Sequence, residues 1–149
     1  MSFDDQKIEI DVLQGTLDAE TQFTYSSGSN LAHDTGTLAY AGISFQLTAQ
    51  ETVSGDPVTT FDPPLQVTIH YDPAALGDVP ADSLRLYSWD TDRASWRDVV
   101  TTCIGGEYDG NVDQNWFRVT LCHLSEFAVL GFRPIEKAGF NIFLPLIRN

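Results

Sequence analysis

An alternation of apolar and polar residues with a period of two is the feature that most constrains the fold of this chain. Residues 65–71 show it clearly, with Leu65 and Val67 on one side and Gln66 and Thr68 on the other. Successive side chains of a β-strand point to opposite faces of a sheet, so this pattern predicts a strand with one buried face and one solvated face. Strands of this kind are typical of antiparallel sheets.

The same pattern recurs along most of the chain. Further alternating segments occupy residues 8–12, 22–26, 38–47, 84–86 and 117–129. Within them, Gly42 predicts a turn or β-bulge. Only residues 73–77 are typical of a helix, and only of a single turn, with Pro near its start and Gly at its end. Since no long amphipathic helix is predicted, the sequence argues against the α/β enzyme folds and favours an all-β, antiparallel β-sandwich.

The chain divides into one domain and a tail. Residues 1–131 are predicted to form a single sandwich domain, because their length and hydrophobic content allow a substantial core. Residues 132–149 begin with a short linker and continue with the apolar run Phe-Asn-Ile-Phe-Leu-Pro-Leu-Ile at 140–147. Pro145 would place such a run at the edge of a sheet. The tail is therefore predicted to be an edge strand or a docking segment.

The charge balance excludes several classes of partner. The chain has 21 acidic and 8 basic residues, which gives a net charge of −13. Such a surface repels phosphate backbones and anionic lipids, so we expect neither nucleic-acid nor membrane-surface binding. No apolar run approaches the ~18 residues of a membrane span, and the first residues lack the basic and apolar regions of a signal peptide.

Metal binding is not expected either. Asp109, Asn111 and Asp113 alternate like the ligands of a calcium loop, but the glycine is misplaced and no Glu closes a twelve-residue loop. A solvated turn is the preferred interpretation. His33 and His70 stand alone, without the spacing of a zinc site. The sequence thus predicts no metal and no cofactor.

One stretch carries residues suited to chemistry, namely His123, Leu124 and Ser125. His123 and Ser125 are two apart, so in a strand they share one side, with Leu124 pointing away. An imidazole can act as a base near neutral pH and can activate a serine hydroxyl. Attack of the Ser125 oxygen on the Leu124 carbonyl would move the chain from nitrogen to oxygen, and water would then hydrolyse the ester. These three residues are predicted to form a site of self-cleavage.

Two other interpretations of this stretch remain open. His123 and Ser125 can instead form a hydrogen-bonded polar pair that fixes a turn in an uncleaved interaction module or stalk. A turnover hydrolase is disfavoured, because the chain has no Gly-x-Ser-x-Gly motif and Glu126 is predicted to point away from Ser125. If the protein is an enzyme, we expect a single intramolecular turnover. Its partner would then be its own C-terminal fragment, residues 125–149.

The same residues resemble a known cleavage motif. His123-Leu124-Ser125 followed by Phe-Ala-Val-Leu at 127–130, with Trp96 and Cys103 upstream, resembles the proteolysis-site motif of the autoproteolysis-inducing (GAIN) domain of adhesion receptors. In that family, cleavage occurs before the hydroxyl residue. This chain departs from the family because it has two cysteines rather than four, and Gly131 replaces the usual Met.

A second resemblance covers the middle of the chain. Residues 61–69 (Phe-Asp-Pro-Pro-Leu-Gln-Val-Thr-Ile), residues 84–89 (Leu-Arg-Leu-Tyr-Ser-Trp) and Trp96 are similar to the ZU-type β-sandwich of zonula occludens proteins, netrin receptors and ankyrins. Some members of that family cleave themselves and others keep the fold uncut. The resemblance therefore implies a β-sandwich and leaves cleavage open.

The two cysteines bear on location. Cys103 and Cys122 flank a predicted hairpin and can form one disulfide, while two buried free thiols are the alternative. A chain with few Cys and Lys and many Thr, Asp and Gly suits a secreted or cell-surface bacterial domain, which is the location we expect.

Overall fold

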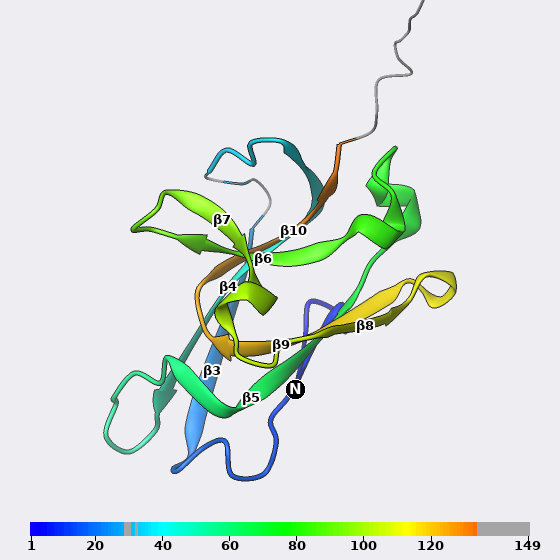
Figure 1. The fold of residues 1–149 in the computed structure, drawn as a ribbon. Helices are drawn as coiled ribbons and strands as arrows, with labels where there is room; N and C mark the ends of the chain where they lie inside the picture. The colour runs from blue at the N-terminus through cyan, green and yellow to red at the C-terminus, as the bar shows by residue number, and fades with distance from the viewer. Residues whose placement is uncertain (29–30, 32, 134–149) are drawn as a thin grey trace, which may run out of the picture.

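The protein is an all-β sandwich of two antiparallel five-stranded sheets (Figure 1). The computed structural model describes residues 1–28, 31 and 33–133. Within this part of the chain, no helix is long and apolar enough to cross a membrane. The tail at 134–149, predicted to be an edge strand or docking segment, lies outside the described residues.

The first sheet has the strand order β1-β2-β5-β9-β8. Its strands are β1 (Ser2–Phe3), β2 (Ile8–Asp11), β5 (Thr60–His70), β9 (Trp116–His123) and β8 (Tyr108–Asn111). The sequence predicted a solvated turn where β8 lies. Pairing with β9 overrides the weak strand propensity of this segment, since Asp109 and Gly110 pair with Arg118 and Phe117.

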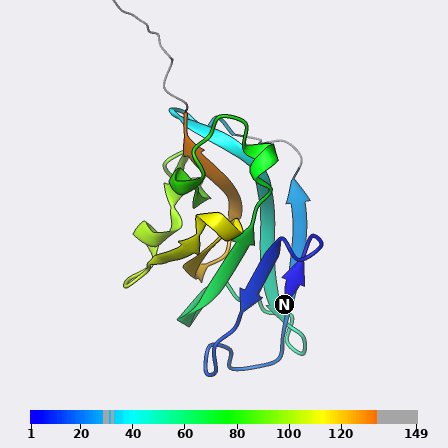
Figure 2. The same cartoon turned by 90° about the vertical axis from the view of Figure 1, so that its right-hand side faces the viewer.

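The second sheet has the order β3-β4-β10-β6-β7. Its strands are β3 (Thr21–Gly28), β4 (Leu38–Glu51), β10 (Glu126–Phe132), β6 (Arg85–Asp90) and β7 (Ser95–Asp98). Figure 2 shows the long β4 beside β3. The predicted bulge is confirmed: the register between β4 and β10 shifts between Ala128 and Leu130, beside Gly42, whose φ is +89°.

The alternating residues form the core as predicted. Leu65, Val67 and Ile69 of β5 are fully buried between the sheets. From the second sheet, Phe45 and Phe127 pack ring to ring with centroids 5.3 Å apart. Because each fully buried large apolar side chain contributes about 1.5–3 kcal/mol, the inward faces of the strands supply most of the stability of the domain.

Strand β10 is the most buried element around the predicted site. It lies in the middle of its sheet, paired with β4 on one side and β6 on the other. Its four residues 127–130 have no exposed surface. Gly131 follows them at a close approach, since a Cβ there would lie against Val79 and 2.8 Å from the Ser83 hydroxyl.

Short 3-10 turns replace helices throughout the described part of the chain. The predicted turn at 73–77 is present as η1 (Pro73–Leu76), with the Asp72 carboxylate accepting from the Ala74 amide. The sequence predicted only this one. Three more single turns join strands, namely η2 (Ala81–Ser83), η3 (Val99–Thr102) and η4 (Val112–Gln114).

Candidate functional site

The predicted site lies where the chain crosses from one sheet to the other. β9 ends at His123 in the first sheet, and β10 begins at Glu126 in the second. Leu124 and Ser125 therefore bridge the sandwich. The alternation of residues 117–129 runs through His123 and Ser125 and would place both of them on the buried face of a strand. Both are instead only half-buried, at the rim of the core, because the chain changes sheets between them.

Backbone hydrogen bonds hold the crossing at both ends. The Leu124 amide donates to the Thr59 carbonyl at 3.2 Å, and the Ser125 carbonyl accepts from the Leu47 amide at 3.2 Å. Thr59 directly precedes β5 of the first sheet, while Leu47 belongs to β4 of the second. The two residues on either side of the candidate bond are thus fixed to opposite sheets.

The Ser125 hydroxyl has a partner other than His123. It donates to the backbone carbonyl of Trp89, in β6, at 3.2 Å. Within the described part of the chain, no hydrogen bond joins the side chains of His123 and Ser125. Any attack by this oxygen on the Leu124 carbonyl therefore requires the hydroxyl to leave the Trp89 carbonyl first.

His123 is suited to act as a base. Burial lowers the pKa of His123 below its ordinary value of 6.5, and the positive charge of Arg97 lowers it further. The imidazole is therefore mostly neutral at neutral pH, which is the form that accepts a proton. His123 and Ser125 line one depression, and Leu124, which was predicted to point away from them, lines it as well.

Two depressions flank the Leu124–Ser125 bond. The first, of about 390 Å³, is lined by His123 and Ser125 together with Asp90 and Arg97. The second, of about 360 Å³, lies on the side of β4 and reaches the same bond. Each is large enough for several water molecules, which occupy about 30 Å³ apiece in the liquid. Water therefore has room beside the bond.

A cluster that the sequence did not predict lies next to the site. The ring of His33 stacks on Trp89 at 3.7 Å between centroids, and its Nε2 is 3.3 Å from a carboxylate oxygen of Glu126. His33 stands alone in the sequence, because Glu126 lies 93 positions further along the chain. Among the described residues, the hydrogen-bond partner of the Glu126 carboxylate is His33 and not His123.

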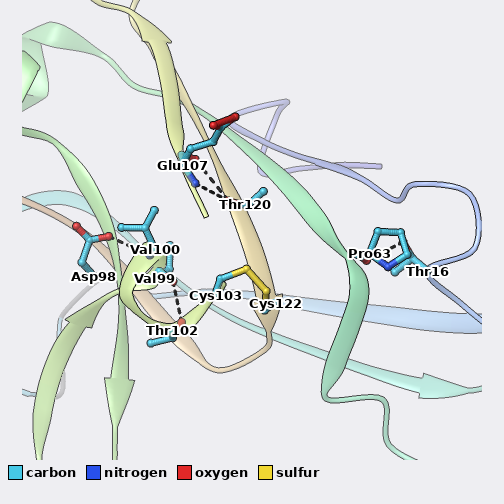
Figure 3. The surroundings of a disulfide bond; sticks show 10 residues. All are labelled: Thr16, Pro63, Asp98, Val99, Val100, Thr102, Cys103, Glu107, Thr120 and Cys122. Carbon is cyan, nitrogen blue, oxygen red and sulfur yellow. Dashed lines mark hydrogen bonds between the residues drawn. A yellow bond between two sulfur atoms is a disulfide. The ribbon is translucent and has the colours of Figure 1, made fainter. Parts of the chain in front are cut away.

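The two cysteines form a disulfide (Figure 3). Cys103, at the end of η3, is joined to Cys122 of β9, with Cα atoms 5.4 Å apart. Of the two alternatives that the sequence left open, the structure has the bridge rather than two free thiols. It fastens the β7–β8 connection to the residue that precedes His123.

Asp109, Asn111 and Asp113 alternate in sequence like calcium ligands but form no metal-binding cluster within the described residues. Among the described residues, no group of three or more His, Cys, Asp or Glu side chains is placed to hold a metal ion. Asp109 belongs to β8, and Asp90 pairs with the guanidinium of Arg97 at 3.6 Å. His70 contacts the Glu9 carboxylate at 3.2 Å.

Comparisons with known proteins identify no relative. No protein-family model matches the chain, and neither the curated proteins nor the solved structures contain a significant match. The resemblances to the ZU-type sandwich and to the autoproteolysis-inducing domain therefore stay predictions.

Proposed function

We propose that this domain cleaves its own Leu124–Ser125 peptide bond once and keeps the C-terminal piece bound. The observation that carries the proposal is the crossing itself. A serine hydroxyl directly follows the bond, a histidine with a lowered pKa lines the same depression, and the backbone is held on both sides. The motif resemblance of residues 123–130 agrees with this function.

The reaction has two steps. His123 takes the proton of the Ser125 hydroxyl while the Ser125 oxygen attacks the Leu124 carbonyl carbon. The bond between that carbon and the Ser125 nitrogen then breaks as His123 passes the proton to the nitrogen. This leaves an ester between Leu124 and the Ser125 oxygen. Water then hydrolyses the ester, which restores the hydroxyl and gives a new carboxylate at Leu124 and a new amine at Ser125.

The position of β10 explains why the C-terminal piece would stay in place. After a cut at Leu124, residues 125–149 form a 25-residue fragment that contains all of β10. This strand is paired on both sides and buried at residues 127–130. Removing it would open the second sheet through its middle. Its release would therefore require unfolding of the domain or pulling by a partner protein.

A second function is favoured by one specific observation. The Ser125 hydroxyl donates to the Trp89 carbonyl, and this hydrogen bond, which fixes the crossing to β6, could be the whole role of the hydroxyl. In that case the protein is an uncleaved sandwich that acts as a stalk or an interaction module. The two functions differ in one outcome, namely whether the Leu124–Ser125 bond is intact in the mature protein.

We also propose a secreted or cell-surface location. The Cys103–Cys122 bridge supports it, because disulfides persist in oxidising compartments and are rare in the cytosol of mesophiles. The acidic surface supports the expectation of no nucleic-acid partner.

Variants at the site test the proposal on a denaturing gel. Wild-type protein should run as two fragments, Ser125→Ala as one chain, and Ser125→Cys as a partly cut mixture, because a thiol can make the same acyl shift. His123→Ala should cleave slowly. Thr91→Ala is the matched control, since Thr91 lines both depressions but is remote from the bond in sequence, and it should be cut like the wild type. An uncut, folded wild type would favour the second function.

A further inference from the structure

β3 is a sheet edge without the usual protection against pairing. The edges β1, β7 and β8 have two to four residues each, and the last two include charged residues. β3 has eight residues, Thr-Gln-Phe-Thr-Tyr-Ser-Ser-Gly, with neither a charge nor a proline. Long, neutral and regular edges of this kind are templates for an added strand.

The outer side of β3 has no strand partner among the described residues. β3 pairs with β4 over all eight residues without a register shift, and its other side makes no backbone hydrogen bond to a described residue. Phe23 and Tyr25 on its inner side are only half-buried, although both pack against the core. Tyr25 is already stacked on Phe3 of β1, with ring centroids 4.9 Å apart, so a further strand would mainly cover Phe23.

We propose that residues 140–147 of this chain dock on β3 as an antiparallel sixth strand of the second sheet. Charge favours this occupant. Residues 133–149 have three basic residues and one acidic residue, a net of +2, whereas residues 1–132 have five basic and 20 acidic residues, a net of −15. The docking run itself is uncharged, like β3, so neither strand buries an unpaired charge.

The position of Pro145 sets the orientation of the added strand. Proline has no amide hydrogen to donate to β3, so the backbone nitrogen and carbonyl of Pro145 point to the solvent side of the added strand. The even-numbered residues then make the hydrogen bonds to β3, because alternate residues of a strand turn their backbone groups to the same side. These are Phe140, Ile142, Leu144 and Leu146, whose apolar side chains share one face. That face matches the half-buried Phe23.

The linker is long enough for docking within one chain. β10 ends at Phe132, and the Arg133 guanidinium donates to the Gly36 carbonyl in the β3–β4 connection at 3.0 Å. A site outside β3 lies three strand spacings, about 14 Å, to the side of β10 and about 14 Å along it. The resulting span of about 20 Å is within the ~26 Å that eight extended residue steps cover. Entry near Gly28 makes the added strand antiparallel to β3.

Hydrogen exchange measured by NMR on the full chain tests the proposal. Alternate β3 amides face β4, and the others face outward, so only docking protects the outward set. We expect those amides to be protected at least about tenfold in the wild type. Ile142→Pro removes a bonding amide and should abolish their protection, whereas the control Phe143→Pro removes an amide that faces solvent and should leave it in place.

Three results would overturn the proposal. They are outward β3 amides that exchange freely in the wild type, equal effects of the two prolines, and protection that rises with protein concentration, which would assign docking to a second copy. None depends on cleavage, because β10 and residues 140–147 belong to the same fragment.

Discussion

Removal of the disulfide gives a stability change that can be worked out from the structure. Cys103 and Cys122 are 19 residues apart in sequence, so the bridge closes a loop of about 20 residues. The chain-entropy relation gives about 3 kcal/mol of stabilisation for such a loop. In a domain of this size, that loss corresponds to a fall in Tm of about 10 °C.

The double variant Cys103→Ala/Cys122→Ala measures this contribution. Urea unfolding followed by the fluorescence of the three tryptophans should show a free energy of unfolding lower by about 3 kcal/mol. The m value should rise slightly, because the denatured chain without the bridge exposes more surface. Wild-type protein in a reducing buffer is the control and should show a similar loss.

Two results would refute the reasoning about the bridge. One is a pair of titratable free thiols in the native, unreduced protein. The other is a loss of less than about 1 kcal/mol in the double variant, which would mean that the bridge does not restrict the denatured chain as the entropy argument requires.

Three further predictions follow from particular contacts. Gly131→Ala should lower the free energy of unfolding by about 1–3 kcal/mol in chemical denaturation, because the added Cβ would press on Val79 and Ser83; an unchanged stability would contradict this packing. Tyr108→Phe should cost about 1–3 kcal/mol, since the hydroxyl of this β8 residue donates to the Asp98 carboxylate and accepts from the Leu86 amide of the other sheet; no loss by thermal unfolding would show that these bonds are exchanged for water without cost. Because the pKa of His123 is lowered in the folded state, the unfolded chain takes up a proton at this residue at a higher pH than the folded chain does. The contribution of neutral His123 to stability should therefore be lost as the pH falls below 6.5 and through the lowered pKa, and the rate of any cleavage should fall over the same range. His123→Gln should flatten this part of the pH profile of the free energy of unfolding, and an unchanged profile would argue against the assignment.

Most of the fold could be predicted from the period-two pattern. The alternation in residues 65–71 predicts β5, and the alternation in residues 117–129 predicts β9 and β10, because core-facing side chains recur at every second position. This pattern does not show where a strand ends and the chain passes to the other sheet. The apolar stripe continues through His123 and Ser125, although the chain crosses the sandwich there.

The site was predictable only in part. His123, Leu124 and Ser125 are adjacent in sequence and all line one depression, so their proximity could be predicted, but the alternation of their sides could not. The Trp89 carbonyl that accepts from Ser125, and the Arg97 charge that acts on His123, come from other strands. Single-sequence patterns carry no information on such long-range contacts. The β8 edge was missed for a related reason, since its strand conformation depends on pairing with β9.

The central claim is that the Leu124–Ser125 bond is cut by the domain itself. An intact-mass spectrum of freshly purified wild-type protein under denaturing conditions, with and without reductant, tests it most directly. We predict two species that sum to the mass of the chain plus one water and divide after Leu124. Reduction should not change the number of species, because both cysteines lie in the larger fragment. A single species near 16.5 kDa in a folded sample would contradict the claim and leave His123 and Ser125 as structural residues of the crossing.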